Sequence, residues 1–150
     1  MNMMKYSGLP VLLFFLIPVA AAAQYDFSGS WAGKLTQNEG GYTPEYDFEL
    51  YLVQKGKHIT GRSYVKTGRI HAVMELHGEV VDGKWVNLTE TRILDNWKYD
   101  DMDWCYKTIR LRLFTDGKRQ RLEGGWSGTT GSHADCVPGE ISLAKQVPRA

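Results

Sequence analysis

The amino-acid sequence predicts an all-β protein: a single antiparallel up-and-down barrel of about eight strands, preceded by a signal peptide. After residue 24, apolar and polar residues alternate with the period of a strand, and helical spacing is almost absent. Short β-rich runs are separated by glycine-containing turns, which join each run to the next as a hairpin. Closing such a sheet removes its exposed edges. A two-sheet β-sandwich is the alternative, because alternation alone does not separate the two folds.

Residues 1–23 resemble a secretory signal peptide. Lys5 is the only charged residue in this segment, and the apolar stretch 9–19 is too short to span a bilayer comfortably. Four alanines at 20–23 offer the small residues that a signal peptidase needs, so Gln24 is the expected first residue of the mature chain. We therefore expect an exported protein, periplasmic or extracellular, with one domain over 24–150 and no membrane span after cleavage.

The alternation defines eight expected strands, each bounded by turn residues. They cover residues 27–37, 45–55, 58–67, 69–81, 84–94, 104–115, 118–127 and 140–146.

The first three strands are bounded by two turns, Asn-Glu-Gly-Gly at 38–41 and Lys-Gly-Lys at 55–57. The second strand shows the clearest pattern, with Phe48, Leu50 and Leu52 on one face and acidic residues on the other. This pattern is typical of a half-buried antiparallel strand.

The fourth and fifth strands flank Asp82-Gly83, the strongest hairpin signal in the chain. Apolar residues alternate with His and Glu along the fourth strand, and Val86 and Leu88 share one face of the fifth. The irregular segment 95–103 follows.

The last three strands begin with 104–115, where Ile109, Leu111 and Leu113 share a face. A second Asp-Gly turn, at 116–117, leads into the seventh strand. A loop of small residues, 127–139, precedes the eighth strand, and residues 147–150 are expected to fray.

The charge of the mature chain is balanced. Removing the leader takes away one lysine, so that 17 basic residues face 17 acidic ones. Nucleic acids and anionic membrane surfaces require a positive excess, so neither is expected as the main partner.

Cys105 and Cys136 are both in the exported part. An even pair of cysteines in an oxidising compartment is most simply a disulfide. A thiol pair that is reactive or binds metal is the alternative.

Several short motifs carry a family resemblance. Gly29-Ser30-Trp31 resembles the Gly-x-Trp signature of lipocalins and related calycin barrels. Trp104-Cys105, Leu122-x-Gly124-x-Trp126 and Cys136-x-Pro138-Gly139 extend the similarity to small exported bacterial barrel proteins, mostly uncharacterised. The resemblance implies a lipocalin-like barrel in which Trp31 packs across the closed end. The Thr-Asp-Tyr turn of lipocalins is not evident.

No pattern in the sequence indicates catalysis. The chain lacks a nucleophile elbow, HExxH, a P-loop and a dinucleotide-binding glycine motif. His71 and His77 share a face of the fourth strand but are too far apart to hold one ion without a further ligand. We therefore expect a non-enzymatic protein with no metal or cofactor.

Glu90 is a candidate binding residue, because counting in twos from Val86 and Leu88 places it on the apolar face. An unpaired carboxylate is costly there. Either Glu90 lies at the rim or pairs with a donor such as Arg92, or it faces a ligand at the mouth of a cavity.

The aromatic residues of the 95–106 segment are candidate ligand-binding residues: Trp97, Tyr99, Trp104 and Tyr106. The same segment carries Asp95, Asp100, Asp101 and Asp103. Aromatic faces stack on sugars or apolar ligands, and carboxylates accept hydroxyl hydrogen bonds. The acidic residues do not meet the EF-hand spacing for Ca²⁺. Alternatively, Trp104 and Tyr106 pack beside the disulfide.

Two functions follow from these observations. The first is a carrier of a small apolar or amphipathic molecule inside the barrel, unless large side chains fill it. The second is an interaction module that presents the 95–106 segment to a glycan or an envelope protein. The sequence does not indicate an oligomeric state.

Overall fold

The structure, a computed structural model, describes residues 13–18 and 25–148. Most of the expected signal peptide, residues 1–12 and 19–23, lies outside these ranges, as do Gln24 and residues 149–150. Residues 13–18 have no regular secondary structure and are exposed. Export therefore remains a prediction. Within the described ranges, no helix is long and apolar enough to cross a membrane.

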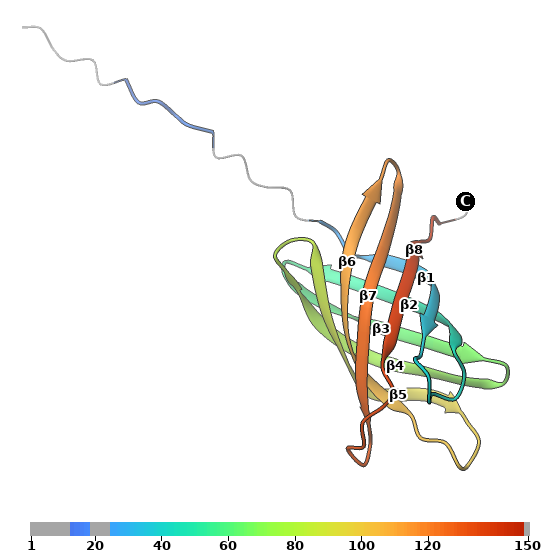
Figure 1. Cartoon of the computed structure of the whole chain (residues 1–150). Helices are drawn as coiled ribbons and strands as arrows, with labels where there is room; N and C mark the ends of the chain where they lie inside the picture. Colours follow the sequence, from blue (N-terminus) through green and yellow to red (C-terminus); the bar gives the residue numbers. More distant parts are fainter. Residues whose placement is uncertain (1–12, 19–24, 149–150) are drawn as a thin grey trace, which may run out of the picture.

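The eight strands form one closed antiparallel barrel in which each strand pairs with its neighbours in sequence (Figure 1). The barrel closes where β1 pairs with β8, over Trp31–Leu35 and Ile141–Lys145. The expected up-and-down barrel is thus confirmed, and the sandwich alternative is wrong. The strands are β1 (Gly29–Thr36), β2 (Glu45–Lys55), β3 (His58–Thr67), β4 (Ile70–Val81), β5 (Trp85–Trp97), β6 (Cys105–Asp116), β7 (Arg119–Thr130) and β8 (Gly139–Lys145).

The connections gather at two ends of the barrel. The β2–β3, β4–β5 and β6–β7 hairpins lie at one end, and the long β6–β7 hairpin projects beyond the others (Figure 1). We call this the closed end, because Phe27 and Trp31 are fully buried there and the Trp31 indole donates a hydrogen bond to the Phe27 carbonyl (3.0 Å). The other four connections, residues 37–44, 68–69, 98–104 and 131–138, form the open end.

Apolar side chains that alternate along every strand fill the barrel toward the closed end. Phe48, Leu50 and Met74, all within 1 % of full burial, belong to this core. The same core includes Leu52, Leu76, Leu88, Ile109, Leu111 and Leu122. Because these side chains fill the half of the barrel toward the closed end, room for a ligand is left only toward the open end.

Strand β5 differs most from its expected bounds. It runs to Trp97 instead of residue 94, and the irregular segment is correspondingly shorter. Two register shifts against β4 leave Thr91 and Leu94 without a partner of their own, as extra residues of β-bulges. Each bulge reverses the inside-outside alternation, so Ile93 packs against the core and Arg92 is exposed.

The expected disulfide is confirmed. Cys105, the first residue of β6, is bonded to Cys136 in the β7–β8 loop, with their Cα atoms 6.2 Å apart. It ties this loop to the open end of the barrel.

Candidate ligand-binding site

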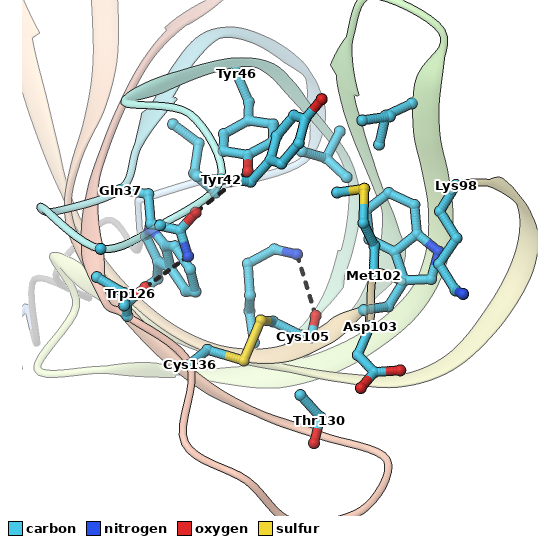
Figure 2. Close-up of a pocket in the computed structure, with 18 of the residues that line it drawn as sticks. Gln37, Tyr42, Tyr46, Lys98, Met102, Asp103, Cys105, Trp126, Thr130 and Cys136 are labelled. Carbon is cyan, nitrogen blue, oxygen red and sulfur yellow. Dashed lines mark hydrogen bonds between the residues drawn. A yellow bond between two sulfur atoms is a disulfide. The ribbon is translucent and has the colours of Figure 1, made fainter. Parts of the chain in front are cut away.

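A cavity of about 680 Å³ lies at the open end of the barrel. Its walls combine the ends of strands with three of the loops (Figure 2). The lining residues are Leu35, Gln37, Gly40, Gly41, Tyr42, Tyr46, Val65, Ile70, Lys98, Tyr99, Asp101, Met102, Asp103, Trp104, Cys105, Lys107, Trp126, Thr130, Asp135, Cys136 and Val137.

Part of the cavity wall is aromatic, and hydrogen bonds that involve the loops hold it in place. The Tyr46 hydroxyl donates to Gln37 Oε1 (3.2 Å), and Gln37 Nε2 donates to the Val137 carbonyl (2.9 Å). Figure 2 shows Tyr42 and Tyr46 on one side of the opening and the Cys105–Cys136 disulfide on the opposite side. Burial raises the pKa of Tyr46, so its phenol stays a neutral donor over the physiological range.

Trp126 forms another part of the wall. Its indole Nε1 donates to the Thr36 carbonyl (2.9 Å), which holds the ring between β7 and the end of β1. Leu35 and Val65, both nearly buried, lie beside this cavity as well. This part of the wall is therefore mainly apolar.

A buried polar cluster lies at the base of the cavity: Ser63, Glu90 and Lys107. The Lys107 ammonium lies 3.0 Å from Glu90 Oε2, and the two side chains are 5 % and 0 % exposed. The backbone N–H of Lys107 donates to the same oxygen (2.8 Å), and the Ser63 hydroxyl donates to Glu90 Oε1 (2.5 Å). Both carboxylate oxygens are thus satisfied within the barrel.

Of these three residues, Lys107 is the one that lines the cavity. Its Nζ lies 5.9 Å from the ring centroids of both Phe48 and Trp126, at the outer limit of a cation–π contact. Nζ also donates weakly to the Cys105 carbonyl (3.5 Å). The base of the cavity is therefore a hydrogen-bond donor among aromatic rings.

The expectation for Glu90 was correct in its face but wrong in its suggested partner. Glu90 points inward and is buried. Arg92 does not pair with it, because the bulge at Thr91 turns Arg92 outward, where its guanidinium lies 2.5 Å from Glu75. Glu90 itself does not line the cavity, but it contacts Lys107, which does.

Sequence reasoning missed Lys107 and Ser63. A signal for Lys107 was present, since Ile109, Leu111 and Leu113 share a face of β6 and counting back by two reaches Lys107. Ser63 lies on the same face of β3 as Val65. An inward lysine and an inward glutamate on adjacent strands predict a pair inside the barrel.

The 95–106 segment divides into two groups. Tyr99 and Trp104 line the cavity, and Trp104 also packs against the core beside the disulfide. Trp97 and Tyr106 do not line it. The Trp97 ring makes an edge contact with Tyr99 (centroids 4.9 Å apart) and lies under the guanidinium of Arg69.

Tyr106 lies instead beside a separate shallow hollow, with Thr129 and Cys136. Among the acidic residues, Asp101 and Asp103 reach the rim of the cavity, together with Asp135 from the β7–β8 loop. Lys98 is the basic residue of this rim, so the formal charge of the rim is negative.

The histidines do not form a common site. His71 lies 3.8 Å from Asp95 on the outer surface, and His77 lies farther along the same strand. Within residues 13–18 and 25–148, no group of three His, Cys, Asp or Glu side chains is placed to hold a metal ion.

Neither a protein-family model nor a curated protein matches this chain. The lipocalin resemblance therefore rests on the motifs and on the barrel itself.

Proposed function

We propose that this protein is an exported, non-catalytic, lipocalin-like carrier that binds a small amphipathic molecule in the cavity at its open end. The observation that carries the proposal is the cavity itself, an apolar and aromatic space above a buried Lys107. Binding sites for small molecules are concave and mostly apolar, with a few polar groups that fix orientation.

The dimensions of the cavity suit such a ligand. About 680 Å³ falls within the range of small-molecule pockets, roughly 300–1,000 Å³. An eight-stranded barrel is just wide enough to hold one small ligand. Because the core fills the closed half, the ligand would enter between the loops and stop at Lys107.

The disulfide supports export, because such bonds persist in oxidising compartments. It also limits how far the β7–β8 loop can move away from β6. A carrier of this kind would keep its loops in place without a ligand. The deep charged groups, Lys107 and Glu90, are paired with each other, which suits a binding role.

Tyr99 provides a direct test of this function. It lines the cavity but is 47 % exposed, so Tyr99→Ala should remove a contact surface without loss of core packing. Binding of the neutral fluorescent probe phenylnaphthylamine should weaken several-fold in this variant. The melting temperature should change little.

Tyr51→Ala is the matched control, because Tyr51 is 51 % exposed on the outside of β2 and does not line this cavity. It should leave probe binding unchanged. Failure of the wild-type protein to bind phenylnaphthylamine, or equal effects of the two variants, would refute a ligand site at the open end.

Glycan binding at the rim is the second candidate function. The exposed Tyr99 ring lies beside Asp101 and Asp103, an arrangement of ring and carboxylates that suits sugar recognition. In that case the Trp97→Ala/Tyr99→Ala double variant should abolish binding on a glycan array, while Lys107→Met should leave it intact. If the protein is instead a carrier, Lys107→Met should weaken binding of its ligand.

A further inference from the structure

We infer that the ligand of this cavity presents an uncharged hydrogen-bond acceptor to Lys107, and that the site discriminates against anionic head groups. This inference rests on the proposed function and specifies its ligand class. A buried lysine at the base of a lipophilic cavity would ordinarily indicate a carboxylate ligand. The surroundings of Lys107 argue against that assignment.

The Lys107 ammonium retains hydrogen-bonding capacity toward the cavity. It carries three N–H donors. The ammonium forms an ion pair with Glu90 Oε2 at 3.0 Å, and one N–H makes the long contact of 3.5 Å with the Cys105 carbonyl. Among the residues that the structure describes, no other hydrogen-bond acceptor for Nζ is present. A ligand oxygen at the base of the cavity would complete its coordination.

The positive charge of Lys107 is already compensated. Glu90 accepts hydrogen bonds from the Ser63 hydroxyl and the Lys107 backbone N–H, and its Oε2 forms an ion pair with the Lys107 ammonium. A ligand carboxylate would bring a second negative charge into a buried space that holds a single cation. Removing charges from water is costly unless each is paired, so an anionic ligand would lose affinity here.

The rim adds to this discrimination. Asp101, Asp103 and Asp135 line the opening against a single basic residue, Lys98. An approaching anion would therefore meet a negative potential before it reached Lys107. A neutral ligand would not be repelled by this potential. The aromatic wall, including Trp126, suits an apolar body of either kind and does not discriminate between them.

Decanol and decanoate test the inference, because they share an alkyl chain and differ in the charge of the head group. Both are titrated into the folded wild-type protein at neutral pH, below the concentrations at which they aggregate, in competition with phenylnaphthylamine. We expect decanol to displace the probe at a concentration at least about tenfold lower than decanoate, a ratio that corresponds to one buried charge left poorly paired.

Variants of the ion pair provide a second measurement. Glu90→Gln leaves Lys107 without its counter-charge, so decanoate should gain affinity relative to decanol and the preference should reverse. Ser63→Ala is the control, since it removes a hydrogen bond from Glu90 but no charge. It should keep the preference of the wild-type protein.

The outcomes separate the two proposals. Equal or tighter binding of decanoate by the wild-type protein would overturn the ligand class, while probe binding would still support a carrier. Absence of binding by phenylnaphthylamine and both decyl compounds would refute the carrier and the ligand class together. Should Glu90→Gln not fold, the comparison on the wild-type protein decides.

Discussion

Glu90 and Lys107 form an ion pair from which water is almost excluded, since their side chains are 0 % and 5 % exposed. Such a pair adds little stability compared with an apolar pair of the same volume, because both charges must be desolvated. Loss of one partner is different: the other charge then stays buried without compensation. This asymmetry leads to a prediction about unfolding.

Glu90→Gln should lower the free energy of unfolding by about 3 kcal/mol, the typical effect of breaking a buried ion pair. Urea denaturation of both proteins measures the difference. Glu90→Gln/Lys107→Met, which removes both charges, should recover part of the loss. A Glu90→Gln midpoint equal to that of the wild-type protein would show that Lys107 is not confined as described.

Glu75→Gln is the control for this measurement. Glu75 of β4 also pairs with a basic residue on the neighbouring strand, Arg92 of β5, but this pair is exposed. The guanidinium lowers the pKa of the Glu75 carboxyl by hydrogen bonding and by its charge. Exposed pairs contribute little to stability, so this variant should unfold at nearly the wild-type urea concentration.

The inward face of Glu90 could be predicted from the sequence, because strict alternation holds from Val86 to that residue. Its partner could not. The bulge at Thr91 depends on how β5 pairs with β4, and it moves Arg92 to the outer surface. A one-residue change in register reverses every side chain beyond it, so local alternation fails there.

At the scale of the elements, strands β1, β7 and β8 approach one another closely where the cavity wall begins. Gly139 pairs with Trp126, and the Trp126 indole crosses to the Thr36 carbonyl. A Cβ atom at residue 139 would lie 1.8 Å from that same carbonyl oxygen. Only glycine fits there without displacing β1.

Gly139→Ala should therefore destabilise the protein by about 1–3 kcal/mol, the usual cost of overpacking, and should weaken probe binding by shifting Trp126. Thermal unfolding and phenylnaphthylamine titration measure the two effects. Gly131→Ala is the matched control, because nothing lies within 4 Å of a Cβ atom at that residue. Equal stability of the two variants would contradict the close packing of β8 against β1.

At the scale of the whole molecule, the strand order and the disulfide followed from the sequence, but the cavity did not. Hairpin signals such as Asp82-Gly83 join neighbouring strands, and a closed barrel follows when the last strand pairs with the first. The cavity depends on loops that are distant in the chain, such as those carrying Gln37, Met102 and Val137. These loops come together only because the barrel closes, and no local sequence pattern predicts that contact.

Four of the five tryptophans distinguish the cavity from the rest of the barrel. Trp104 and Trp126 line the cavity, whereas Trp31 is buried at the closed end and Trp85 lies on the outer surface under Arg110. Each indole N–H gives its own signal in a ¹⁵N-correlated NMR spectrum, so decanol binding can be located directly.

Titration of the ¹⁵N-labelled protein with decanol is therefore the most direct test of a ligand site at the open end. The indole signals of Trp104 and Trp126 should shift progressively to saturation, while those of Trp31 and Trp85 stay in place. Movement of Trp31 or Trp85 without Trp104 and Trp126, or no movement at all, would contradict a binding cavity above Lys107.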